Sequence, residues 1–122
     1  MRPTKEVEIW VDTFSKKIEV SAEAVHLGVR AQDEVVWRCQ QGTAKICFPG
    51  SSPFRDRAQT YHCPQGGSVA SGPVILKASK KARTFRYNIL VEVAKPGKTK
   101  AGKPRTARFG KDPEVVVDPE PA

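Results

Sequence analysis

Two cysteines flank a short glycine-containing turn in the stretch WRCQQGTAKICF, residues 37–48. Thiols at this spacing leave three alternatives: a metal pair, a disulfide, or two small side chains in a β-hairpin. A cross-strand disulfide needs both cysteines on one face of the sheet, with Cβ atoms about 3.8 Å apart. Alternation places Cys39 inward with Trp37, whereas Phe48 takes an inward position and leaves Cys47 outward. We therefore expect unpaired thiols, with Cys47 the more reactive.

The other metal-ligating residues that the sequence offers are His26, His62 and Cys63. His62 and Cys63 are adjacent, so on a strand their side chains point in opposite directions. Structural zinc uses paired spacings such as C-x2–4-C or H-x3–5-H, and no such pair occurs here. We expect no metal site. An odd number of cysteines, three, together with the lack of an apolar signal segment after Met1, favours a cytoplasmic protein.

No catalytic motif emerges from the nucleophilic residues. The stretch GGSVASG, residues 66–72, contains Ser68 and Ser71. It lacks the strand–turn–helix context of a nucleophile elbow and the Lys-Ser/Thr of a phosphate loop. The sequence therefore indicates a non-enzymatic protein with no catalytic residue.

The elements that must position these residues are β-strands. Apolar residues alternate with polar ones over short segments separated by turn residues, which is typical of an antiparallel sandwich or barrel. Residues 49–57 and 64–73 are expected loops because of their Gly, Pro and Ser content. We expect one domain, residues 1–122, with a frayed tail at 119–122. The expected strands cover residues 6–12, 17–21, 24–30, 33–39, 44–48, 83–93 and 114–118.

Positive charge gathers in two segments. Residues 95–111 contain seven Lys or Arg and no acid, and residues 77–86 contain five more and no acid. Removing these twelve from the 21 basic residues leaves nine, against 13 acidic residues in the rest of the chain. The chain is thus an acidic body with two basic segments. Residues 95–111 should form a basic loop within the domain, either a mobile linker or a long extended hairpin.

The order VHLGVRAQDEVVWRC, AKICF, SPF, GGSVASGPV, TFRYNILVEV and DPEVVVD resembles the cupredoxin-like β-sandwich family. Gln32-Asp33 stands at the position of a Gly-Asp turn, and Trp37 matches the core tryptophan. Residues 84–87 match the aromatic strand, and residues 112–118 match the D-P-x-I-I-V-D type strand of bacterial members without copper ligands. The resemblance covers residues 5–93 and 112–118. It implies an all-β Greek-key sandwich, with an immunoglobulin-like sandwich as the alternative.

The resemblance also implies where copper would bind. Type-1 copper needs two His, one Cys thiolate and usually a weak axial Met. Ala44 or Lys45 stands where the first His is expected, and Ile89 stands at the Cys position. No His or Met follows in residues 89–122. We expect a copper-free sandwich with no cofactor, and an unusual metal-binding protein is one alternative.

The basic segment 95–111 is the candidate contact surface. The leading hypothesis is a binding or structural module that docks on a protein partner or serves as a subunit of a larger assembly. The alternative is a non-specific binder of nucleic acid or an anionic surface. No apolar run approaches the length of a membrane span, and no small-molecule substrate is indicated. The candidate partner or anion-binding residues are Lys95, Lys98, Lys100, Lys103, Arg105, Arg108 and Lys111.

Overall fold

The computed structural model describes residues 4–12, 17–29, 32–54, 59–77, 79–98 and 104–119. These residues form strands and no helix, as the alternation predicts. No helix in this part of the chain is long and apolar enough to cross a membrane. The strands are β1 (Thr4–Asp12), β2 (Lys17–Val20), β3 (Ala24–Leu27), β4 (Glu34–Cys39), β5 (Thr43–Phe48), β6 (Gln59–Cys63), β7 (Ser68–Ala70), β8 (Arg83–Arg86), β9 (Asn88–Lys98), β10 (Pro104–Lys111) and β11 (Glu114–Val117).

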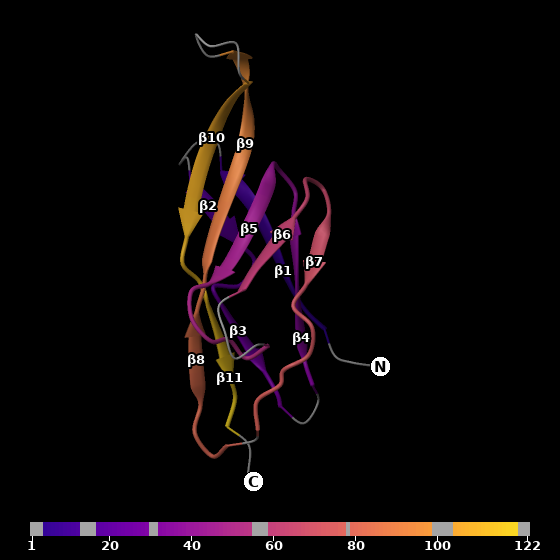
Figure 1. The fold of residues 1–122 in the computed structure, drawn as a ribbon, viewed down its shortest axis with the longest axis vertical. Helices are drawn as coiled ribbons and strands as arrows, with labels where there is room; N and C mark the ends of the chain where they lie inside the picture. Colours follow the sequence, from indigo (N-terminus) through magenta and orange to yellow (C-terminus); the bar gives the residue numbers. More distant parts are fainter. Residues whose placement is uncertain are drawn as a thin grey trace.

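Strand pairing among the described residues gives three sheets (Figure 1). One has the order β2-β1-β4-β7, the second β10-β9-β5-β6, and the third, shorter one β3-β11-β8. The expectation of a wholly antiparallel sandwich is wrong at two places. β1 pairs with β4 in parallel, and β11 pairs with β3 in parallel. Parallel neighbours need a long crossover connection, and here the chain makes further strands between them.

Side chains at alternate positions of the strands form the core, and the inward positions predicted for Trp37, Cys39 and Phe48 are confirmed. Polar residues between these positions face outward, so each strand contributes one face to the interior. Val20, Val29, Phe85 and Val93 also pack against the core but stay half-buried. The inward residues that the structure buries are Val7, Ile9, Val11, Ile18, Val25, Leu27, Val35, Trp37, Cys39, Ala44, Ile46, Phe48, Tyr87, Ile89, Val91, Val115 and Val117.

The strand expected over residues 83–93 is divided at Tyr87. β8 pairs with β11 in the third sheet, whereas β9 pairs with β5 and β10 in the second. At the division, the Tyr87 amide donates a hydrogen bond to the Pro113 carbonyl, 3.1 Å away. Inward alternation continues through the division, so the sequence pattern contains no sign of it.

The expected loop over residues 64–73 contains the short strand β7. Its Val69 is half-buried against the core and pairs with Trp37 of β4. Ser71 then secures the strand by two bonds to Val35: its amide donates to the Val35 carbonyl at 2.8 Å, and its Oγ accepts from the Val35 amide at 2.9 Å. Ser71 is therefore a structural residue in this fold.

Five aromatic rings join the two four-stranded sheets at the centre of the core. Trp37 comes from β4, whereas Phe48 and Tyr61 come from β5 and β6 of the other sheet. Tyr87 stacks on Phe48 with ring centroids 5.1 Å apart, and Phe54 meets Trp37 edge-on at 6.5 Å. Within this cluster the Trp37 indole N–H donates to the Tyr87 hydroxyl at 3.3 Å, and both side chains are fully buried. Aromatic pairs in these geometries stabilise beyond the area that they bury.

Replacing Tyr87 by Phe should lower the free energy of unfolding by about 1–3 kcal/mol, because it leaves the buried Trp37 N–H without an acceptor. Tyr61→Phe is the matched control. The Tyr61 hydroxyl donates to the Ser71 carbonyl at 3.1 Å in a partly buried setting, so we expect a smaller loss. Urea denaturation measures both. An unchanged or higher stability of Tyr87→Phe would contradict the role given to this bond.

Burial raises the pKa of Tyr87 to about 12, and the Trp37 hydrogen bond opposes that rise. An unfolded tyrosine titrates near pH 10. Folding therefore favours the protonated phenol. This contribution to stability is fully present below about pH 10 and is lost as the pH rises through about 12. Tyrosinate absorbance of the native protein should show a transition near pH 12 that Tyr87→Phe lacks. A native Tyr87 that ionises near pH 10 would contradict this.

Candidate functional site

The basic segment 95–111 takes the second of its two expected forms where the structure describes it. The backbone of residues 95–98 lies in β9 and that of residues 104–111 in β10, and these strands pair antiparallel. The predicted binding residues in the described strands are Lys95, Lys98, Arg105, Arg108 and Lys111; Lys100 and Lys103 lie outside the described residues.

The outer half of this hairpin leaves the body of the molecule. β5 pairs with β9 only from Asn88 to Glu92, and among the described residues the rest of β9 pairs with β10 alone. Figure 1 shows both strands continuing together past the ends of the others, at the top of the view. We call residues 93–98 and 104–107 the arm. Its base passes close to Gly42, which has a φ of 69° and where an added Cβ would overlap the Glu92 carbonyl.

The positive charge of the arm has no acidic residue within the arm to balance it. The register places Lys95 opposite Arg105, with an irregularity between Pro104 and Arg105, and the arm contains no acidic residue. Like charges at opposed positions destabilise a ladder. A two-stranded ribbon is also marginal in water without a third strand or a packed face. Within its own sequence, the arm therefore has no opposite charge to offset Lys95, Lys98 and Arg105.

The two remaining basic residues of the described hairpin, Arg108 and Lys111, each have an acidic neighbour. The register places Arg108 opposite Glu92. The Lys111 Nζ lies 2.6 Å from a carboxylate oxygen of Glu23. These two cations thus belong to the base of the hairpin, whereas Lys95, Lys98 and Arg105 belong to the arm.

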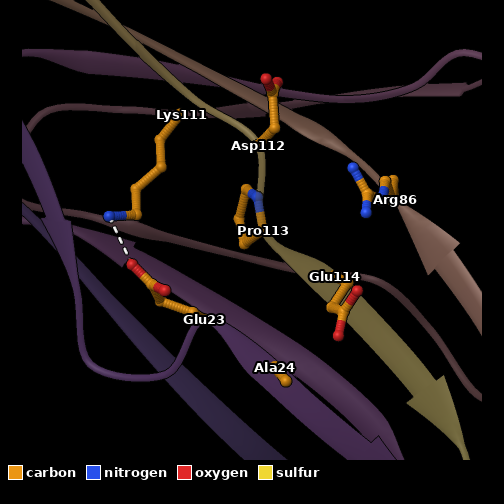
Figure 2. Close-up of a pocket in the computed structure, with 7 residues that line it drawn as sticks. All are labelled: Glu23, Ala24, Arg86, Lys111, Asp112, Pro113 and Glu114. Carbon is orange, nitrogen blue, oxygen red and sulfur yellow. Dashed lines mark ion pairs between the residues drawn. The ribbon is translucent and has the colours of Figure 1, made fainter.

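A shallow cleft of about 400 Å³ lies where β10 ends and β11 begins. Figure 2 shows Lys111 and Glu23 pointing toward one another on one side of it, with Arg86 on the other. Asp112 and Glu114 add two more carboxylates to the lining. Because cations and carboxylates are mixed there, the cleft favours neither sign of ligand. The Lys111–Glu23 ion pair connects β10 to the residue before β3, and the Glu114 amide of β11 donates a hydrogen bond to the Glu23 carbonyl at 2.8 Å.

The second basic segment, residues 77–86, lies at the other end of the long axis. Figure 1 shows β8 at the bottom and the arm at the top. The register places Arg86 opposite Glu114 of β11, and the Arg83 guanidinium donates to the Lys77 carbonyl at 2.8 Å. The arm and the lysines of the second segment therefore lie at opposite ends of the molecule, and the two segments meet where Arg86 and Lys111 line the same cleft.

All three cysteines are free, as the alternation predicts for Cys39 and Cys47. Cys39 is buried, and Cys47 is half-buried on the opposite face of its strand. The buried neighbour of Cys39 is Cys63. The Cys63 Sγ donates to the Trp37 carbonyl of β4 at 3.6 Å. Burial, and then the nearby Cys63, raise the pKa of Cys39, and burial also raises the pKa of Cys63. Such thiols are poor nucleophiles at neutral pH.

The predicted metal-ligating types are dispersed. Within the described ranges no three His, Cys, Asp or Glu side chains are grouped so that they could hold a metal ion. His62 is exposed on β6, and His26 lies on β3, where its Nδ1 is 2.8 Å from an Asp118 carboxylate oxygen. At the positions that the cupredoxin resemblance would give to copper ligands, Ala44 and Ile89 are buried among apolar side chains.

Among the contacts that the sequence did not predict are the proximity of Cys39 to Cys63 and the Glu23–Lys111 ion pair. Each joins residues far apart in the chain and on different sheets or layers. The stretch QTYHC, residues 59–63, does contain a usable signal. Its alternation puts Cys63 on the inward face with Tyr61, as the structure has it.

Thiol reactivity should follow burial. Ellman's reagent should modify Cys47 first and Cys39 and Cys63 far more slowly, because the latter two are buried and hold little thiolate. In denaturant all three should react. Cys47→Ser is the control, and should remove only the fast phase. Fewer than three thiols in denaturant under reducing purification, or a fast phase that survives Cys47→Ser, would contradict the arrangement described.

Comparison with protein-family models, curated proteins and solved structures finds no match for this chain. Its function must therefore be inferred from the arm and from the charges of the hairpin.

Proposed function

We propose that the chain is a non-enzymatic, nucleic-acid-binding module in which a copper-free β-sandwich presents the basic arm to the phosphate backbone. The observation that carries this proposal is the arm itself. It is a two-stranded ribbon beyond the sandwich, it contains Lys95, Lys98 and Arg105, and it has no acid to offset them. The sandwich is the rigid support from which the ribbon extends.

The composition of the arm favours nucleic acid over a protein partner, which was the leading hypothesis from the sequence. The buried centres of protein interfaces are rich in aromatic residues and poor in Lys. The arm has the opposite composition, with lysines and no aromatic residue. The large apolar side chains exposed among the described residues, Trp10 and Ile75, belong to β1 and to the segment before β8.

Binding of this kind would depend on charge and show little sequence preference. Each phosphate that a Lys or Arg neutralises releases condensed counterions, so affinity falls steeply as salt rises. Phosphate contacts position a protein on nucleic acid and by themselves read no sequence.

We further propose that the sandwich is connected as a cupredoxin-like Greek key. Two observations support this. Neighbouring strands such as β1 and β4 are separated in the chain by strands that belong to other positions. Gln32 has a φ of 53°, which suits a turn where the family has Gly, and Asp33 Oδ2 accepts from the Gly28 amide at 2.8 Å.

The variant K95Q/K98Q/R105Q should bind labelled DNA at least about tenfold more weakly at low salt, because three phosphate contacts are lost. Fluorescence anisotropy of single- and double-stranded oligonucleotides across a salt series measures this. For the wild type, log K should fall linearly with log salt. The slope of the variant should be shallower by up to about three.

The matched control is K77Q/K80Q/K81Q, which removes the same three charges from exposed lysines at the other end of the molecule. It should stay within about threefold of the wild type, since only long-range attraction changes. Thermal melts check that both variants fold. The proposal fails if neither form of DNA binds at low salt. It fails equally if polyglutamate of matched charge binds more tightly than DNA, since that result indicates an acidic protein partner.

A further inference from the structure

The arm has the cross-section of a single β-ribbon. Paired strands lie about 4.8 Å apart, and residues 93–98 and 104–107 pair with each other and with no third strand of the described chain. The major groove of B-form DNA, about 12 Å wide, admits a two-stranded ribbon, whereas the minor groove is only about 6 Å wide.

Cationic residues stand on both strands of this ribbon. Lys95 and Lys98 belong to β9, and Arg105 belongs to β10. A groove is bordered by the phosphates of two nucleic-acid strands, so a ribbon with cations on both of its strands can approach both borders. Six residues of β9, 93–98, extend for about 20 Å at about 3.3 Å each. Over that length a duplex presents about twelve phosphate charges, twice those of one strand.

Single-stranded nucleic acid is a poorer fit. Proteins that bind single strands stack successive bases on aromatic side chains, and the arm contains no aromatic residue. The nearest ring in the hairpin, Phe109, is half-buried against the core. Duplex RNA fits poorly for a different reason: its A-form major groove is too deep and narrow for a protein to enter.

We propose that the ligand of the arm is double-stranded DNA and that the ribbon lies in its major groove. This inference rests on the nucleic-acid-binding function proposed above and specifies its substrate. The sandwich stays outside the groove, because the ribbon is the only part of the described hairpin that extends past the neighbouring strands.

The test compares one mixed sequence of about 20 base pairs, long enough for more than one turn of groove, as DNA duplex, DNA single strand and RNA duplex. The wild-type protein should bind the DNA duplex at least about tenfold more tightly than either alternative. Methyl green, which occupies the major groove, should displace the protein, and distamycin, which occupies the minor groove, should not. K95Q/K98Q/R105Q should lose the preference for duplex DNA, and K77Q/K80Q/K81Q should keep it.

The outcomes separate this inference from the function on which it rests. Equal or tighter binding of the single strand or of the RNA duplex overturns the inference and leaves nucleic-acid binding in place. Displacement by distamycin but not by methyl green overturns the choice of groove. Failure of all three nucleic acids to bind overturns the proposed function as well.

Discussion

The contact between Trp37 and Tyr87 connects the parts of this fold that the chain itself keeps apart. Trp37 lies on β4 in one four-stranded sheet, and Tyr87 lies between β8 and β9, where one sheet passes into another. Their hydrogen bond gives the buried indole N–H an acceptor in the dry interior. Because β9 begins one residue after Tyr87, the same contact fixes where this strand begins, and its outer end becomes the arm.

The arm depends on that anchor because it has little stabilisation of its own. The inner part of β9 is held by β5 and by buried Ile89 and Val91. Beyond Glu92 the ribbon pairs with no third strand of the described residues, and only Val93 at its base is seen to pack against the core. An element with so few compensating contacts is kept in place by the segment that enters it. Gly42 also lies at the base of the arm, so close to the Glu92 carbonyl that no side chain would fit there.

Period-2 alternation was sufficient to predict the inward residues, because a strand with one buried face allows no other arrangement. It could not predict the sheets to which the strands belong. Phe85, Tyr87 and Ile89 share one alternation, yet the strands on either side of Tyr87 pair with different neighbours. β7 was missed because the Gly, Pro and Ser residues of the stretch 64–73 indicate a loop. Of the three residues of β7, only Val69 packs against the core. The charge of the candidate site was visible in the sequence. Its division into the arm and a base where Lys111 pairs with Glu23 was not, because that pair depends on the placement of β3 beside β11.

β10 is the edge strand of its sheet, and an unprotected edge invites further strands to pair with it. The sequence of the arm opposes such pairing. Pro104 of β10 has no amide hydrogen to offer another strand, and a second copy would bring its own positive charges to the same edge. The residues that suit the arm to a polyanion thus also hinder growth of the sheet from copy to copy. We therefore expect copies of this chain not to assemble into fibrils through β10, even at protein concentrations at which bare β-edges do so.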